Sequence, residues 1–143
     1  MIAANKGHIL TIASGASYVS VAGLADYTAS KAAILSFHEA LNQELRHIYK
    51  APNVLTTSVH PSWIRTPLIA GVEDELKKQG VSIIEPEDAA QAVVDRVWGC
   101  EGGQVFLPAE AARASYIRGL PGWVAERMRD GVSKTVMEVV KKA

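Results

Sequence analysis

The sequence predicts an α/β fold built on a parallel sheet. Short apolar segments rich in β-branched residues, at 7–14, 53–61 and 103–108, alternate with longer segments whose apolar residues recur at helical spacing. The order strand, helix, strand over the first of these segments is that of a βαβ unit, in which the two strands run parallel. With 143 residues, 48% of them hydrophobic and 21% charged, the chain has the composition of a folded globular protein.

Charge and cysteine content exclude several functional classes. Fifteen acidic and fifteen basic residues are mixed along the chain rather than gathered in runs, which argues against nucleic-acid binding. The single Cys100 excludes an internal disulfide and fits a reducing compartment. No apolar run approaches the roughly 20 residues of a membrane span, and Lys6 and His8 interrupt any signal-like start. We expect a cytoplasmic protein, with peripheral contact to an intracellular membrane as the alternative.

The first strand and helix carry the clearest patterns. The run GHILTIAS at 7–14 follows a glycine and suits a buried parallel strand, and residues 15–24 form a loop. Asp26 is a candidate N-cap, and no Gly or Pro interrupts the chain from there to Ile48, so we expect a helix over 26–48. Its apolar stripe consists of Ile34, Phe37, Leu41, Leu45 and Ile48. A second stripe, of small residues suited to close packing against a sheet or helix, consists of Ala29, Ala33, Ser36 and Ala40.

The second half of the chain continues the alternation. The strand at 53–61 stops at a proline, and residues 63–84 are expected to form an irregular flap whose most helix-prone piece is EDELKKQ. Pro86 followed by two acidic residues begins a helix that ends near Gly99, before the strand at 103–108. The tail is predicted to form an amphipathic helix on the stripe Val124, Met128, Val132, Val136 and Val140.

Three polar side chains are placed to meet at one end of this sheet. In an open parallel sheet the ligand crevice lies beyond the carboxyl ends of the strands, and Ser14 ends the first strand. Tyr27 and Lys31, at i and i+4, share one face of the following helix. An ammonium next to a phenol lowers its pKa from the usual value near 10. We therefore expect Tyr27 to act as general acid or base, Lys31 to tune it and bind a sugar hydroxyl, and Ser14 to donate to the substrate oxygen.

These residues resemble the motif of the short-chain dehydrogenase/reductase family. The resemblance rests on a serine at position 14, thirteen positions before the tyrosine of YTASK at 27–31, and on HPSWIRTP at 60–67. It implies a Rossmann-like, doubly wound parallel sheet and catalysis by Ser14, Tyr27 and Lys31. It also implies NAD or NADP as cofactor. The positions that the resemblance assigns to the nicotinamide end of the cofactor are Tyr27, Lys31, Pro61, Ile64 and Thr66.

The resemblance covers only the C-terminal part of that fold. The sequence contains no Thr-Gly-x-x-x-Gly-x-Gly turn, so the glycine-rich βαβ half that cradles the cofactor phosphates is missing, and Ser62 replaces the family's usual glycine. Residues 1–6 resemble the end of a preceding helix, which makes Met1 a candidate internal methionine. We expect residues 1–109 to be the catalytic half of the domain and 110–143 a helical extension. Such a chain should bind nicotinamide cofactor weakly and turn over slowly or not at all.

The substrate is expected to be a small apolar alcohol or ketone, because apolar side chains dominate the flap, although core packing explains them as well. Contacts to the substrate are assigned to Ser14, Gly15, Trp63 and Leu68. The tail at 121–143, which resembles extensions of the retinol and steroid branch, could cover this site, pair with a subunit or lie on a membrane, with packing inside the chain favoured. The resemblance implies a homo-oligomer formed through the helix at 26–48.

Two alternatives to a chain that is a complete, active enzyme follow from the same residues. The chain could be an inactive remnant that keeps the dimer-forming helix and acts as an interaction module. It could also be a piece of an ordinary enzyme whose start was misassigned. A metal site is not expected, because His8, His38 and His47 lack ligand-like spacing. His60, next to Pro61, is interpreted as a packed or capped histidine rather than a catalytic base.

Overall fold

Three parallel strands form the sheet that the alternating pattern predicts. The computed structural model describes residues 1–141, which form the sheet in the order β1 (Gly7–Ile12), β2 (Val54–Pro61) and β5 (Gly103–Leu107). The register pairs Ile12 with Val59 and Pro61 with Leu107. The carboxyl ends of the three strands therefore meet at one edge of the sheet.

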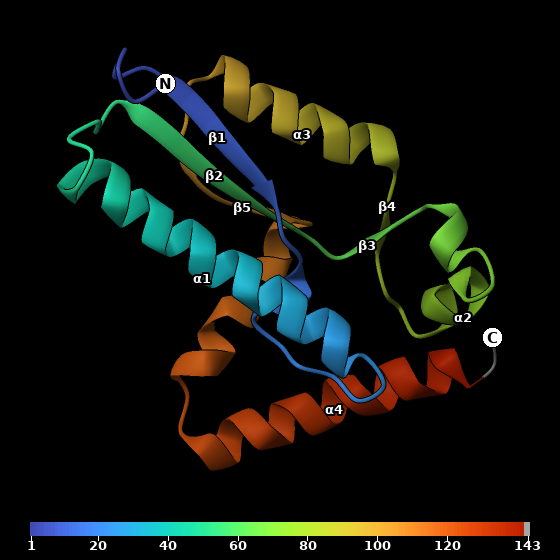
Figure 1. Ribbon diagram of the computed structural model, residues 1–143. Helices are drawn as coiled ribbons and strands as arrows, with labels where there is room; N and C mark the ends of the chain where they lie inside the picture. Colours follow the sequence, from blue (N-terminus) through green and yellow to red (C-terminus); the bar gives the residue numbers. More distant parts are fainter. Residues whose placement is uncertain (142–143) are drawn as a thin grey trace.

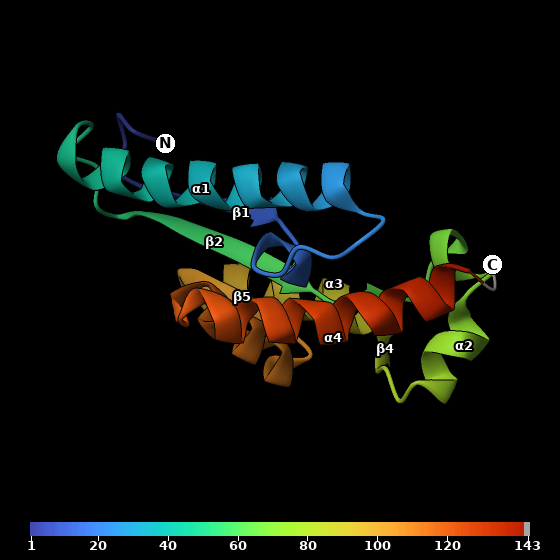
Figure 2. The ribbon, with the colours of Figure 1, turned by 90° about the horizontal axis from the view of Figure 1, so that it is seen from below.

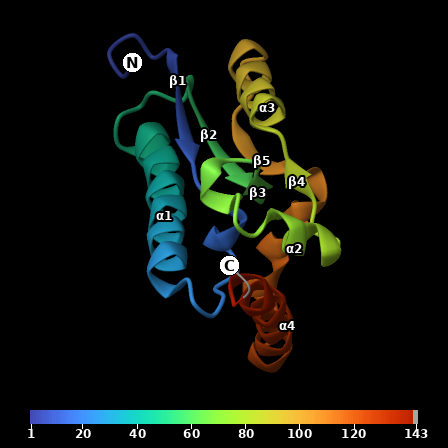
Figure 3. The same cartoon turned by 90° about the vertical axis from the view of Figure 1, so that its right-hand side faces the viewer.

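Helices cover both faces of this sheet. α1 (Ala25–His47) lies on one face and α3 (Pro86–Trp98) on the other (Figure 3). α4 (Gly122–Val140) crosses below the end of the sheet, and its last turns lie beside α2 (Glu73–Lys78), as Figures 1 and 2 agree. The predicted α/β fold with a parallel sheet is confirmed. No helix within residues 1–141 is both long enough and apolar enough to cross a membrane.

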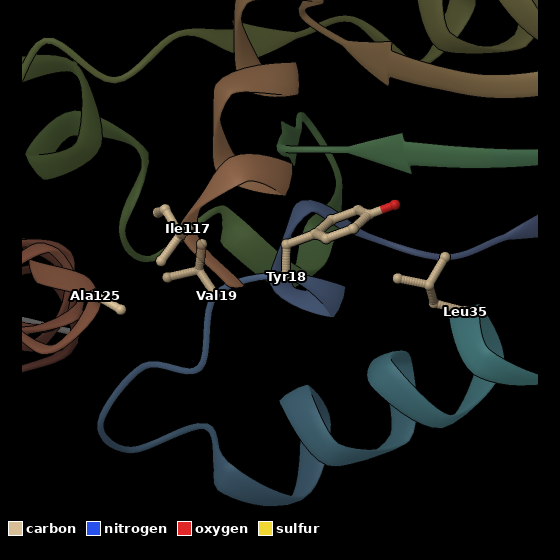
Figure 4. Close-up of a cluster of buried hydrophobic side chains, with 5 residues drawn as sticks. All are labelled: Tyr18, Val19, Leu35, Ile117 and Ala125. Atoms are coloured by element: carbon tan, nitrogen blue, oxygen red, sulfur yellow. The ribbon is translucent and has the colours of Figure 1, made fainter. Parts of the chain in front are cut away.

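Three apolar clusters hold these layers together. The first joins the loop after β1 to α1 and to the C-terminal part of the chain (Figure 4); its members are Tyr18, Val19, Leu35, Ile117 and Ala125. The second closes the far end of α1 against β2 through Leu45, Ala51 and Val54. The third joins the flap to α4 through Ile69, Leu76 and Val139. The C-terminal residues thus share a core with the rest of the chain.

The helix α1 matches the predicted range within one residue, but its buried face differs from the expected stripe. Leu45 is buried as expected, whereas Phe37 and Ile48 are 65% and 66% exposed. The buried positions include Thr28 and His38 instead. The buried face also contains Leu35, and it meets β1 through the polar His38, whose Nδ1 lies 3.1 Å from the Thr11 hydroxyl. The expectation for Phe37 and Ile48 was therefore wrong.

The expected N-cap of α1 was also wrong, whereas the turn at residues 1–6 is compatible with its prediction. The N-cap position of α1 is Leu24, and Asp26 lies in the first helical turn, where its carboxylate accepts the Tyr27 N–H at 2.8 Å. A carboxylate in the first turn still favours the helix, because it faces unpaired N–H groups. Residues 1–6 form a turn in which the Asn5 N–H donates to the Ile2 carbonyl and the Lys6 N–H donates to the Met1 carbonyl, with Asn5 at a left-handed φ of 41°. This pair of bonds is the pattern found at helix C-termini, so the interpretation of residues 1–6 as the end of a preceding helix stays a prediction.

The flap is more ordered than the irregular segment expected from the sequence. It contains a two-stranded parallel ribbon of β3 (Trp63–Ile64) and β4 (Ile83–Ile84), a 3₁₀ turn at Pro67–Ile69, and α2 over the helix-prone EDELKK. Gly80 ends α2 with a φ of 71°, which glycine adopts readily. Arg65 forms ion pairs with Glu73 and Glu85, one from each half of the flap. Short strands of two residues are too brief to predict from alternation.

The predicted stripe of the C-terminal helix coincides only in part with the buried face of α4, and Val124 at its start is half-buried. Val136 is buried, whereas Met128 and Val132 are 43% and 39% exposed, and the side chain of Val140 lies outside the described residues. A strict four-residue repeat drifts around a helix of 3.6 residues per turn, so it winds off the packed face. The positions that pack are Ala125, Val136 and Val139. A 3₁₀ segment, Ala109–Gly119, precedes α4 within the range predicted to be a helical extension.

Candidate functional site

The candidate site lies at the edge where the parallel strands end. The Ala13 N–H still donates to the Val59 carbonyl at 2.8 Å, so β1 and β2 remain adjacent up to Ser14. Gly15 lies against Pro61, because a β-carbon added to Gly15 would stand 3.7 Å from the Pro61 carbonyl oxygen. The strand-end residues named from the sequence are thus neighbours in space.

Ser14 is held by hydrogen bonds to its side-chain oxygen and to its carbonyl oxygen. It is 7% exposed, its backbone is extended, and its Oγ accepts the Ala16 N–H at 3.1 Å. Its carbonyl oxygen accepts the Ser17 N–H at 3.0 Å and lies 3.2 Å from the His60 Nδ1. Since the Oγ already accepts one bond, its own proton is the group that can be offered to a substrate oxygen.

Tyr27 and Lys31 lie in the first two turns of α1, beside the end of β1. The Lys31 Nζ stands 5.8 Å from the centroid of the Tyr27 ring and donates to the Ile12 carbonyl oxygen at 3.3 Å. The Tyr27 side chain is not enclosed, because the residue is 41% exposed. The lysine thereby connects the phenol to the strand that leads into Ser14. The catalytic roles of Ser14, Tyr27 and Lys31 stay predictions.

The remaining predicted site residues lie at the end of β2 or after it. Pro61 ends that strand, Ile64 lies in β3, and Thr66 is exposed at the position that caps the 3₁₀ turn. Leu68 is 91% exposed, so it is open to a ligand. Trp63 packs against the third apolar cluster and is only half-buried. Core packing therefore explains part of its contact surface, as the sequence allowed.

An apolar cavity of about 170 Å³ opens beneath the strand ends, on the α3 face. Its walls are formed by Ile12, Val59, Pro61, Ile64, Ala89, Ala90, Val93 and Leu107. Two of the predicted cofactor positions, Pro61 and Ile64, are among them. The contribution of α3 was missed, although Ala89 and Val93 at i and i+4 are the signal that could have indicated it.

Two buried histidines lie near the site. His60 is fully buried and His38 is 6% exposed, with its Nδ1 3.1 Å from the Thr11 hydroxyl. Burial lowers the pKa of the His60 imidazole, and the hydrogen bond to the Ser14 carbonyl opposes that effect in part. Burial also lowers the pKa of the His38 imidazole. Both rings therefore favour the neutral form in the folded protein.

These two histidines should make the protein less stable in mild acid. The unfolded chain binds their protons near the ordinary pKa of 6.5, whereas the folded chain resists protonation until lower pH. The unfolded state then holds more protons, so the free energy of unfolding falls as the pH drops below 6.5 through the folded-state values. Urea unfolding between about pH 7.5 and pH 5 measures this effect, and a flat profile over that window would contradict it.

The sheet, its two covering layers and the Tyr–Lys pair define a Rossmann-like α/β protein. The chain belongs to the short chain dehydrogenase family, whose profile matches residues 1–77. This confirms the predicted family.

Individual relatives agree with this assignment. Epidermal retinol dehydrogenase 2 of Mus musculus is 36% identical over 97 residues, which are 68% of this chain and 31% of that protein. Estradiol 17-beta-dehydrogenase 11 of Homo sapiens is 32% identical over 108 residues, 76% of this chain and 34% of that protein. Dehydrogenase RED2 of Cochliobolus heterostrophus is 51% identical over 59 residues, 41% of this chain and 22% of that protein. The chain spans about a third or less of these curated relatives.

Solved structures show the same fold. A short chain dehydrogenase from Burkholderia cenocepacia J2315, in complex with NADP, superposes with a TM-score of 0.63 at 24% identity, over 88% of this chain and 48% of that one. A 3-oxoacyl-[acyl-carrier protein] reductase from Brucella melitensis superposes with a TM-score of 0.60 at 23% identity, over 74% and 42%. The fold is therefore a partial Rossmann-like fold.

Proposed function

We propose that residues 1–109 supply the catalytic half of an NAD(P)-dependent oxidoreductase, with residues 110–143 as a helical extension. The reaction interconverts an apolar alcohol and its carbonyl compound. The observation that carries this proposal is the position of Lys31, whose Nζ lies between the Tyr27 ring and the Ile12 carbonyl, two residues before Ser14. A cation in that place can serve both the phenol and a ligand at the strand ends.

Each of the three side chains has a distinct task in this mechanism. The nicotinamide cofactor supplies the hydride in the reducing direction. The Tyr27 hydroxyl donates its proton to the carbonyl oxygen, and the Ser14 hydroxyl donates a hydrogen bond to the same oxygen. The Lys31 ammonium stabilises the phenolate that Tyr27 becomes. In the oxidising direction the same groups act in reverse, with Tyr27 as the base.

The residues present fit the nicotinamide end of such a cofactor. Pro61 and Ile64 line the apolar cavity, which suits the face of an aromatic ring. Thr66, two residues after Ile64, is exposed and carries a hydroxyl. The Lys31 ammonium uses one of its three protons on the Ile12 carbonyl, and the others remain for ribose hydroxyls.

An apolar substrate is supported by the flap. Leu68 is almost fully exposed, and Trp63, at the start of the flap, is half-buried. Together with Gly15 and the Ser14 hydroxyl at the end of the neighbouring strand β1, these positions would offer one polar contact in apolar surroundings. Two relatives are named as retinol and estradiol dehydrogenases, which agrees with an apolar alcohol or ketone.

The exposed face of α1 supports self-association. Phe37 is 65% exposed, and the small side chains of the predicted second stripe, at Ala29, Ala33, Ser36 and Ala40, are exposed as well. Small residues allow a helix of a second copy to approach closely, with Phe37 as an apolar anchor. We propose a homo-oligomer through this face. Trp123, 71% exposed on α4, supports a secondary contact with the surface of an intracellular membrane.

The same exposed face favours a second candidate function. A chain that forms oligomers through α1 but binds no cofactor would act as an interaction module for a longer relative. Both functions use the same helix. They differ in whether Tyr27 and Lys31 bind a cofactor.

Cofactor titration and turnover assays separate the two functions. NADH and NADPH are titrated into the 143-residue polypeptide by fluorescence, and we expect binding weaker than micromolar. Turnover of apolar ketones and aldehydes is then followed at millimolar cofactor, where slow hydride transfer is expected. Micromolar binding would contradict the expected weak affinity. Absence of product at saturating cofactor would overturn the enzymatic proposal in favour of the module.

A further inference from the structure

The next-to-last residue of β2 connects two strand ends through its side chain. His60 is fully buried, and its Nδ1 lies 3.2 Å from the Ser14 carbonyl oxygen at the end of β1. Its other nitrogen, Nε2, lies 3.0 Å from the Ser58 Oγ, two residues earlier on the same strand. Both ring nitrogens are therefore engaged.

The partners of this imidazole select one tautomer. A carbonyl oxygen can only accept, so the proton lies on Nδ1 and is donated to Ser14. Burial keeps the ring neutral, which leaves a lone pair on Nε2. The Ser58 hydroxyl donates to that lone pair.

Aromatic neighbours fix the plane of the ring. Phe106 occupies the paired position on β5, and its ring stacks on the imidazole with centroids 4.9 Å apart and planes at 21°. The Tyr18 ring packs at 5.1 Å with a tilt of 52°, and in Figure 4 its side chain extends between β2 and α1. The Tyr18 and Phe106 rings also contact each other, with centroids 5.7 Å apart, so the three rings form one cluster. Rotation of the imidazole away from Ser14 would disturb both of its ring contacts.

We infer that His60 is a positioning residue that sets the direction of the Ser14 hydroxyl. This inference rests on the proposed function, in which Ser14 donates to the substrate oxygen. His60 fixes the Ser14 carbonyl, and the Ala16 N–H fixes the Oγ of the same residue. Without the imidazole bond, the Ser14 carbonyl keeps only the Ser17 N–H, and the peptide that follows Ser14 gains freedom to rotate.

The tautomer provides a test on the unmodified chain. Nitrogen-15 NMR of the histidine side chains at neutral pH should show His60 with a protonated Nδ1 and an unprotonated Nε2. A proton on Nε2 alone would overturn the inference, because Nδ1 would then have nothing to donate.

Two substitutions separate positioning from packing. His60→Asn places its amide nitrogen near the position of Nδ1 and keeps a donor for the Ser14 carbonyl, whereas His60→Gln places its amide near Nε2 and loses that donor. Amide hydrogen exchange of Ala16 is the readout, because its N–H is bonded to the Ser14 Oγ. We expect His60→Gln to accelerate this exchange by about fivefold, the effect of one hydrogen bond, and His60→Asn to leave it near the wild-type rate.

Global stability, measured by urea unfolding, is the control for both variants. Equal acceleration in His60→Asn and His60→Gln, or none in His60→Gln, would overturn the positioning role. In the turnover assay, His60→Gln should lower kcat with little change in KM, whereas His60→Asn should keep kcat near the wild-type value. A wild-type chain without turnover, but with the expected exchange pattern, would contradict the proposed function and leave the positioning of Ser14 supported.

Discussion

Replacing Tyr27 with Phe should reduce turnover by a factor of about 10² to 10⁴, the contribution of a positioned proton donor. The substitution removes only the hydroxyl, because the ring that lies 5.8 Å from the Lys31 Nζ is kept. Cofactor affinity should therefore change little, since Lys31 and the apolar cavity remain. The measurements are steady-state kinetics with an apolar ketone and a parallel titration of NADPH.

The matched control for this substitution is Tyr49→Phe. Tyr49 follows the other end of α1 and is 46% exposed, close to the 41% of Tyr27. Its hydroxyl lies outside the proposed site, so turnover should stay at the wild-type value. Equal activity of the Tyr27 variant and the wild type would remove Tyr27 from the mechanism. A large loss in both variants would indicate a general effect on the protein.

Patterns that depend on local spacing were predictable from the sequence. Tyr27 and Lys31 lie four residues apart on an uninterrupted helix, so their shared face follows from helical geometry alone. The three strands were also expected, because each is an apolar, β-branched run bounded by Gly or Pro. These features fix the fold class and bring the phenol and the ammonium to the end of β1.

Features that depend on long-range packing were not predictable. Hydrophobicity places Phe37 inside and is neutral about His38, yet His38 is buried against Thr11 and Phe37 is exposed. Which side of α1 meets the sheet depends on the side chains that the strands present to it. These long-range contacts cannot be read from a single sequence. The bond between His60 and Ser14 joins residues 46 positions apart, so no local pattern indicates it.

The flap and α4 depend on each other, and Leu76 tests that dependence. Leu76 of α2 is 1% exposed and packs with Ile69 and with Val139 of α4. The Gln79 amide also donates to the Glu138 carboxylate at 3.0 Å. Since α4 carries Ala125 of the first apolar cluster as well, it connects the flap to the main core. Loss of packing at Leu76 should therefore lower the free energy of unfolding of the whole chain.

Leu76→Ala should lower the free energy of unfolding by about 2 to 5 kcal/mol, because truncation leaves a cavity in a packed cluster. The matched control is Leu68→Ala in the same flap, where the side chain is 91% exposed and the change should stay within about 0.5 kcal/mol. Urea unfolding measures both. If the two variants were equally stable, the flap would unfold separately from the core. Trp63, Ile64 and Thr66 would then be presented to a cofactor by a segment that α4 does not hold in place.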